Sequence, residues 1–86
     1  MEETEKKLSE LYEKEFEKGL KKLTRYRTPA VRAIILEDLY KIARFDPKKI
    51  DTLRGIVEKD VYLRDYDRDL LLKKLERTKS KLEYVI

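Results

Sequence analysis

Six cations and no acidic residue occupy positions 18–36, where they adjoin the most apolar run of the chain. Thr28 and Pro29 lie inside this stretch and are typical of the first turn of a helix. A helix N-terminus offers free N–H groups to anions, arginine binds phosphate oxygens in pairs, and tyrosine stacks on bases. The pattern therefore predicts a phosphate or nucleic-acid contact. We assign it to Lys21, Lys22, Arg25, Tyr26, Arg27, Thr28 and Arg32.

A second interpretation treats the same stretch as a solvated loop whose cations balance the acids of the preceding segment. The net charge of the whole chain is only +4, which is modest for a protein that coats DNA. The two interpretations differ in whether Arg25, Arg27 and Arg32 converge in space.

Catalytic and metal-binding residue types are scarce. The chain has neither histidine nor cysteine, and its two serines, Ser9 and Ser80, occupy positions typical of a helix surface. The segment 65–76 carries acids at the spacing of a calcium loop, but Leu70 stands where that loop needs glycine. We therefore expect no catalytic residue, metal or cofactor, and a protein that is not an enzyme.

A helix-turn-helix over residues 29–59 is a further possibility, with 47–59 as the helix that reads DNA. That segment mixes lysines with acids, and the whole chain lacks the asparagine and glutamine that read base edges. Any nucleic-acid contact should therefore be made mainly with the phosphate backbone.

Four helices are expected to position these residues. Apolar residues recur at steps of three and four in four segments, and Thr28-Pro29 and Asp46-Pro47 mark the starts of two of them. The predicted helices cover about 2–23, 29–44, 47–59 and 66–83. Gly19 and Gly55 fall inside helical patterns, where each marks either a close helix approach or a weak point.

The segment 29–44 is apolar over more than half of its circumference, so we expect it to be the central helix. The predicted fold class is all-α. Residues 1–86 are expected to form one small four-helix domain, packed either as a compact bundle or orthogonally. A core of this size is marginal unless oligomerisation, a partner or unusually good helix packing adds to its stability.

Two apolar segments exceed what such a core needs, and both are candidates for binding a protein partner, either a larger subunit or a second copy. The first helix continues its apolar stripe through Leu8, Leu11 and Tyr12, and the chain ends in Tyr84, Val85 and Ile86. The alternative is that all six side chains pack inside the domain.

Charged residues make up 47% of the chain, and asparagine, glutamine, cysteine and histidine are absent. This composition is typical of ion-pair networks that act at high temperature, so we expect a hyperthermophilic, archaeal source. The sequence has no apolar run long enough to span a bilayer and no N-terminal targeting pattern, which predicts a cytoplasmic protein without a membrane partner.

These observations favour a non-enzymatic accessory or adaptor subunit of a larger complex that processes nucleic acid. DNA replication is the concrete expectation, with a DNA polymerase accessory subunit as one example. The first alternative is a stand-alone DNA- or RNA-binding protein that contacts phosphates through residues 18–36. The second is a homodimeric structural domain without a ligand.

Overall fold

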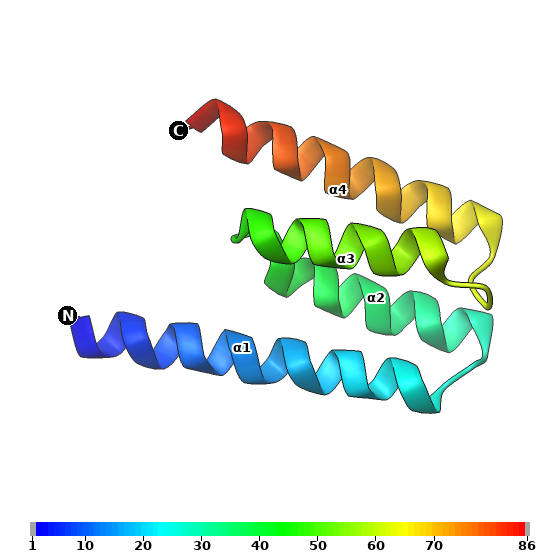
Figure 1. Cartoon of the computed structure of the whole chain (residues 1–86), viewed down its shortest axis with the longest axis horizontal. Helices are drawn as coiled ribbons and strands as arrows, with labels where there is room; N and C mark the ends of the chain where they lie inside the picture. The colour runs from blue at the N-terminus through cyan, green and yellow to red at the C-terminus, as the bar shows by residue number, and fades with distance from the viewer. Residues whose placement is uncertain (1, 86) are drawn as a thin grey trace.

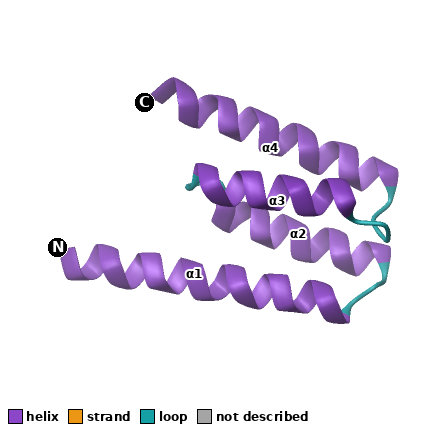
Figure 2. Ribbon diagram, viewed as in Figure 1, coloured by secondary structure: helices purple, strands orange, loops and turns teal. Residues whose placement is uncertain are grey.

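The computed structural model describes the backbone of residues 2–85 and the side chains of residues 6–83. The described chain is all helical, with no strand (Figures 1 and 2). The prediction of an all-α, four-helix fold is confirmed. The helices are α1 (Glu2–Arg25), α2 (Pro29–Ala43), α3 (Pro47–Lys59) and α4 (Asp65–Val85).

The helix ends follow local signals in the sequence. Asp46 precedes α3, and its carboxylate accepts a hydrogen bond from the Lys48 N–H at 3.0 Å, as an N-cap residue does. Thr28 holds the corresponding place before α2 with an extended backbone, but its hydroxyl makes no capping hydrogen bond. Helix α1 continues to Arg25, two residues beyond the prediction, and α2 ends at Ala43, one residue before it.

The four helices run alternately in opposite directions, and α2 is the one that packs against the other three (Figure 1). Within the described residues α1 and α4 make no contact with each other, so the bundle is open on one side of α2. The molecule is accordingly flat, with extents of 42 × 30 × 15 Å. Ile34 of α2 faces the open side and is 63% exposed.

The core forms where α2, α3 and α4 meet, and α1 covers one flank of α2. The core residues are aliphatic and aromatic, and those on the helices recur at helical spacing, so each helix has an apolar face. Packing of these apolar faces stabilises helices that are individually marginal. The buried apolar residues are Phe16, Leu23, Ile35, Leu36, Leu39, Ala43, Ile50, Leu53, Val57, Leu63, Leu71 and Leu75.

The two glycines have different surroundings. A Cβ placed on Gly19 would lie 2.9 Å from Cγ of Leu39 and closer still to one of its methyl groups, so α1 and α2 approach closely at this point. A Cβ placed on Gly55 would meet no atom within 4 Å. Gly19 therefore allows a helix contact, whereas Gly55 only weakens α3.

Ion pairs between helices supplement the core. Lys74 of α4 lies 2.7 Å from Glu37 of α2, and Lys79 of α4 lies 2.7 Å from Asp51 of α3. Lys49 of α3 joins two acids, with its Nζ 2.5 Å from Glu13 Oε1 and 3.0 Å from Asp46 Oδ2. A network of this kind suits a heat-stable protein, and the hyperthermophilic source stays a prediction.

The pKa of Asp46 reflects this network. Burial opposes ionisation of its carboxyl group, but the hydrogen bonds donated by Lys49 Nζ and by the Lys48 N–H outweigh burial and hold the pKa below the ordinary value of 3.8. A carboxylate whose pKa is lowered by folding stabilises the fold above its unfolded pKa. That contribution is lost as the pH falls through the lowered pKa.

We therefore expect Asp46→Asn to reduce the free energy of unfolding by about 0.2–1 kcal/mol at neutral pH, the range for partly exposed ion pairs. Asparagine also caps helices, so the variant isolates the charge. Urea denaturation at neutral pH and well below the ordinary aspartate pKa measures the effect. If the wild type and Asp46→Asn still differ in free energy of unfolding at the acidic pH, the charge of Asp46 is not the cause of the difference.

Candidate nucleic-acid interface

Arg32, predicted to bind phosphate, is a buried residue of α2 that pairs with Asp60. Their exposed fractions are 8% and 6%, respectively. Nε of Arg32 lies 3.1 and 2.9 Å from the two carboxylate oxygens of Asp60, and its NH2 nitrogen lies 2.8 Å from Oδ2. The contact is bidentate and shielded from water, which makes it a strong charge-assisted pair.

The other terminal nitrogen of Arg32 holds the end of α1. Its NH1 group donates hydrogen bonds of 2.6 Å to the carbonyl oxygens of Leu23 and Tyr26. Carbonyls at a helix C-terminus lack partners within the helix, and Arg32 supplies them. Because its guanidinium is buried and its donors are engaged, Arg32 is removed from the predicted phosphate-binding set. Arg25, Arg27 and Arg32 thus do not form one exposed cluster.

Asp60 organises the connector between α3 and α4, residues 60–64. Its Oδ1 accepts hydrogen bonds from the N–H groups of Tyr62 and Leu63, at 2.9 and 3.2 Å. Arg68 of α4 donates to the carbonyl oxygens of Val57, Asp60 and Leu63. One buried ion pair therefore ties this connector to the one between α1 and α2, residues 26–28.

The remaining predicted cations lie on the surface. Lys18, Lys21, Lys22 and Arg25, which we call the cationic surface, line a shallow hollow of about 220 Å³ on α1. Lys18 pairs with Glu15 at 3.5 Å. Among residues 6–83, four neighbouring cations form no ion pair: Lys21, Lys22, Arg25 and Arg27. No acid of this part of the chain lies within ion-pair distance of these four side chains, so they are free to contact phosphate.

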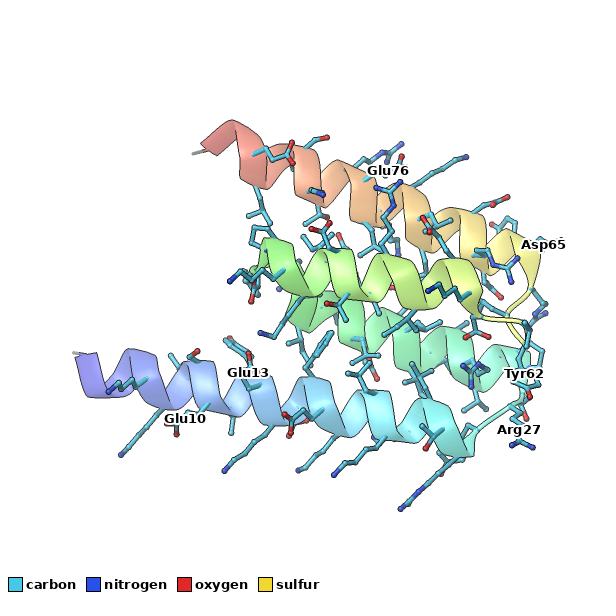
Figure 3. All side chains as sticks on the ribbon, viewed as in Figure 1. Glu10, Glu13, Arg27, Tyr62, Asp65 and Glu76 are labelled. Carbon is cyan, nitrogen blue, oxygen red and sulfur yellow. The ribbon has the colours of Figure 1, made fainter. Side chains whose placement is uncertain are left out.

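The connectors add aromatic side chains to these cations. Tyr26 is 49% exposed, and Tyr62 is 44% exposed. The guanidinium carbon of Arg27 lies 6.0 Å from the ring centroid of Tyr62, and both residues lie at the connector end of the molecule (Figure 3). Thr28 is also exposed. Tyr62 was not predicted, because nothing in the sequence relates it to residues 25–28.

An apolar surface covers the N-terminal half of α1. Leu8, Leu11 and Tyr12 are 47%, 55% and 42% exposed, as a binding role requires. Tyr12 stacks on Phe45, which follows α2 and is 62% exposed, with ring centroids 6.3 Å apart. We call Leu8, Leu11, Tyr12 and Phe45 the partner surface. A hollow of about 340 Å³ is lined by Leu8, Ser9, Tyr12, Ile42, Phe45, Asp46 and Lys49.

Phe45 was not predicted as a partner-binding residue. It lies in a short connector, so no helical spacing related it to the apolar stripe of the first helix. The predicted partner-binding side chains of Tyr84 and Val85, and Ile86 as a whole, lie outside the described residues.

Other kinds of site find little support in the described part of the chain. It contains no group of three or more acids arranged to hold a metal ion. Helices α2 and α3 run side by side in opposite directions (Figure 1), unlike the crossed helices of a helix-turn-helix. Of the four helices, none has both the length and the apolar character needed to cross a bilayer.

Comparison with protein-family models, with curated proteins and with solved structures finds no match for this chain.

Proposed function

We propose that the protein is a non-enzymatic accessory subunit that docks on a larger protein through the partner surface and contacts nucleic-acid phosphates through the cationic surface. A cytoplasmic complex that replicates DNA, such as a polymerase with its accessory subunits, is the concrete setting. The observation that carries the proposal is the group of Lys21, Lys22 and Arg25 on the C-terminal half of α1, none of which forms an ion pair among residues 6–83.

The chemistry of the cationic surface suits a phosphate backbone. Lysine and arginine side chains that project from one helix neutralise successive phosphates and release their counterions. The chain has no asparagine or glutamine, so hydrogen bonding to base edges would depend on other side chains. Binding of this kind is strong at low salt and tolerant of sequence.

The partner surface explains why an accessory role is preferred to a stand-alone one. Large apolar side chains that gather on an exposed surface are typical of protein interfaces. At about 1.5 Å per residue, the 24 residues of α1 span about 36 Å. Leu8, Leu11 and Tyr12 of the partner surface lie on one half of this helix, and the cationic surface lies on the other. A protein and a nucleic acid can therefore bind this helix at the same time.

The test compares two triple variants of equal charge. Lys21→Ala, Lys22→Ala and Arg25→Ala remove the unpaired part of the cationic surface. Lys73→Ala, Arg77→Ala and Lys81→Ala remove the same residue types from exposed positions of α4. We expect the first triple to reduce the slope of log affinity against log salt by about 2–3 units, because each lost phosphate contact accounts for about 0.7–0.9. The α4 triple should leave the slope nearly unchanged.

Fluorescence anisotropy with a labelled oligonucleotide measures these slopes. Equal slopes for the two triples, or no binding by the wild type at low salt, would overturn the nucleic-acid half of the proposal. The docking half is read from affinity purification after nuclease treatment. Docking is supported if a protein co-purifies with the Lys21→Ala, Lys22→Ala, Arg25→Ala variant (the α1 triple) but not with Phe45→Ser. Docking is contradicted if Phe45→Ser recovers as much of that protein as the wild type does.

A further inference from the structure

Two exposed tyrosines from distant parts of the chain lie at the same end of the bundle. The connector between α1 and α2 and the connector between α3 and α4 meet there (Figure 2). Tyr26 belongs to the first connector and Tyr62 to the second, and each ring is close to half exposed. We call Tyr26, Arg27 and Tyr62 the connector face.

The backbone beneath these tyrosines is fixed by one buried ion pair. The carbonyl oxygen of Tyr26 accepts a hydrogen bond from Arg32, and the N–H of Tyr62 donates one to Asp60. Arg32 also lies under Tyr62, with its guanidinium carbon 5.2 Å from the ring centroid. Two aromatic rings on anchored backbone cost little entropy to immobilise, which favours binding of a ligand that both can contact.

Cations without an ion pair among residues 6–83 lie on one side of the connector face, and acids held in ion pairs lie on the other. Arg25 and Arg27 form no ion pair among residues 6–83, and Lys21 and Lys22 continue the positive charge along α1. The first turn of α4 holds Asp65 and Asp67, which form ion pairs with Arg68 and Arg64 at 2.9 and 3.5 Å, respectively. The unpaired cations therefore lie toward α1, and they direct a polyanion bound at the connector face along that helix.

We propose that the connector face binds single-stranded nucleic acid, with bases stacked on Tyr26 and Tyr62 and phosphates on Arg25 and Arg27. This inference rests on the proposed function and names the form of nucleic acid. Stacking needs an open base face, which a single strand offers and a duplex hides between its own base pairs. Arg27, whose side chain is exposed, leaves the ring of Tyr62 to pair with phosphate when a base takes its place.

The test measures binding of oligothymidylate and of a blunt DNA hairpin to Tyr26→Ala and Tyr62→Ala. We expect each variant to lose roughly 5- to 150-fold in affinity for the single strand, the range for one stacked base, with less than a twofold change for the hairpin. Tyr26→Phe and Tyr62→Phe keep the ring and should retain binding. Tyr66→Ala, a change at a 73% exposed residue beside the acids of α4, is the matched control.

Tyr62 lies over the guanidinium of the buried Arg32, whereas the side chain of Tyr26 makes neither a hydrogen bond nor a cation–π contact within residues 6–83. Tyr26→Ala should therefore fold even if Tyr62→Ala does not. Oligouridylate in place of oligothymidylate distinguishes RNA from DNA as the preferred strand. Unchanged single-strand affinity in Tyr26→Ala, or equal losses for strand and hairpin, would overturn the inference. If Lys21→Ala, Lys22→Ala and Arg25→Ala together still weaken binding in that case, the proposed function stands without the inference. If no nucleic acid binds the wild type, the inference and the nucleic-acid half of the proposed function are both wrong.

Discussion

Replacing Arg32 with methionine is expected to lower the free energy of unfolding by about 3–5 kcal/mol, the usual cost of removing one partner from a buried ion pair. Methionine fills similar space but leaves the Asp60 carboxylate charged in a site that is only 6% exposed. It also leaves the carbonyl oxygens of Leu23 and Tyr26 without this donor. The loss is a large part of the 5–15 kcal/mol that stabilises a typical domain.

Urea denaturation followed by circular dichroism measures this loss. Arg25→Met is the matched control, because Arg25 is exposed and outside any ion pair among residues 6–83, so its change should stay within about 0.5 kcal/mol. Asp60→Asn removes the charge of the other partner in the ion pair. The double variant, Arg32→Met with Asp60→Asn, should lose less free energy of unfolding than the sum of the two single losses. A loss in Arg32→Met no greater than in Arg25→Met would show that the pair does not hold the connectors.

Substituting alanine at the two glycines is expected to change stability in opposite directions. At Gly19 the new methyl group would overlap Leu39 of α2, and overpacking of this kind costs about 1–3 kcal/mol, more than the gain of about 1 kcal/mol in helix propensity. At Gly55 the methyl group meets open space, so the propensity gain of about 1 kcal/mol remains. The two variants should differ by about 2 kcal/mol.

Thermal and urea unfolding of Gly19→Ala and Gly55→Ala beside the wild type test this difference, and each variant controls for the other because the chemical change is identical. Combining Gly19→Ala with Leu39→Ala should cost less than the sum of the two changes, because the smaller side chain relieves the overlap. A Gly19→Ala protein as stable as Gly55→Ala would mean that α1 and α2 do not approach closely at this point.

The sequence by itself determined the helices. Asp46 caps α3 through its side chain, and Pro29 and Pro47 each stand in the first turn of a helix, where proline is favoured. The steps of three and four place apolar side chains on one face of each helix. The same periodicity identified α2 as the central helix. These properties could be predicted because they depend on local backbone geometry.

The candidate site was predicted only in part. The cations of α1 are exposed as expected, since a helix that packs on one neighbour leaves most of its circumference in solvent. Arg32 was misassigned, although it precedes Leu36, Leu39 and Ala43 at steps of four, three and four and so lies in line with the buried stripe of α2. That spacing was the available signal, but a buried cation also needs a partner that spacing does not identify.

Tertiary structure alone decided the rest. Arg32 is a structural residue because Asp60, 28 positions later, reaches its guanidinium. The Arg32–Asp60 pair brings Tyr62 beside Arg27. The close approach of α1 and α2 leaves no room for a side chain at Gly19, whereas Gly55 faces open space. Each of these facts depends on which helix faces share the core. Local sequence fixes where a helix begins and which side is apolar, whereas the packing of all the helices together determines which distant residues meet.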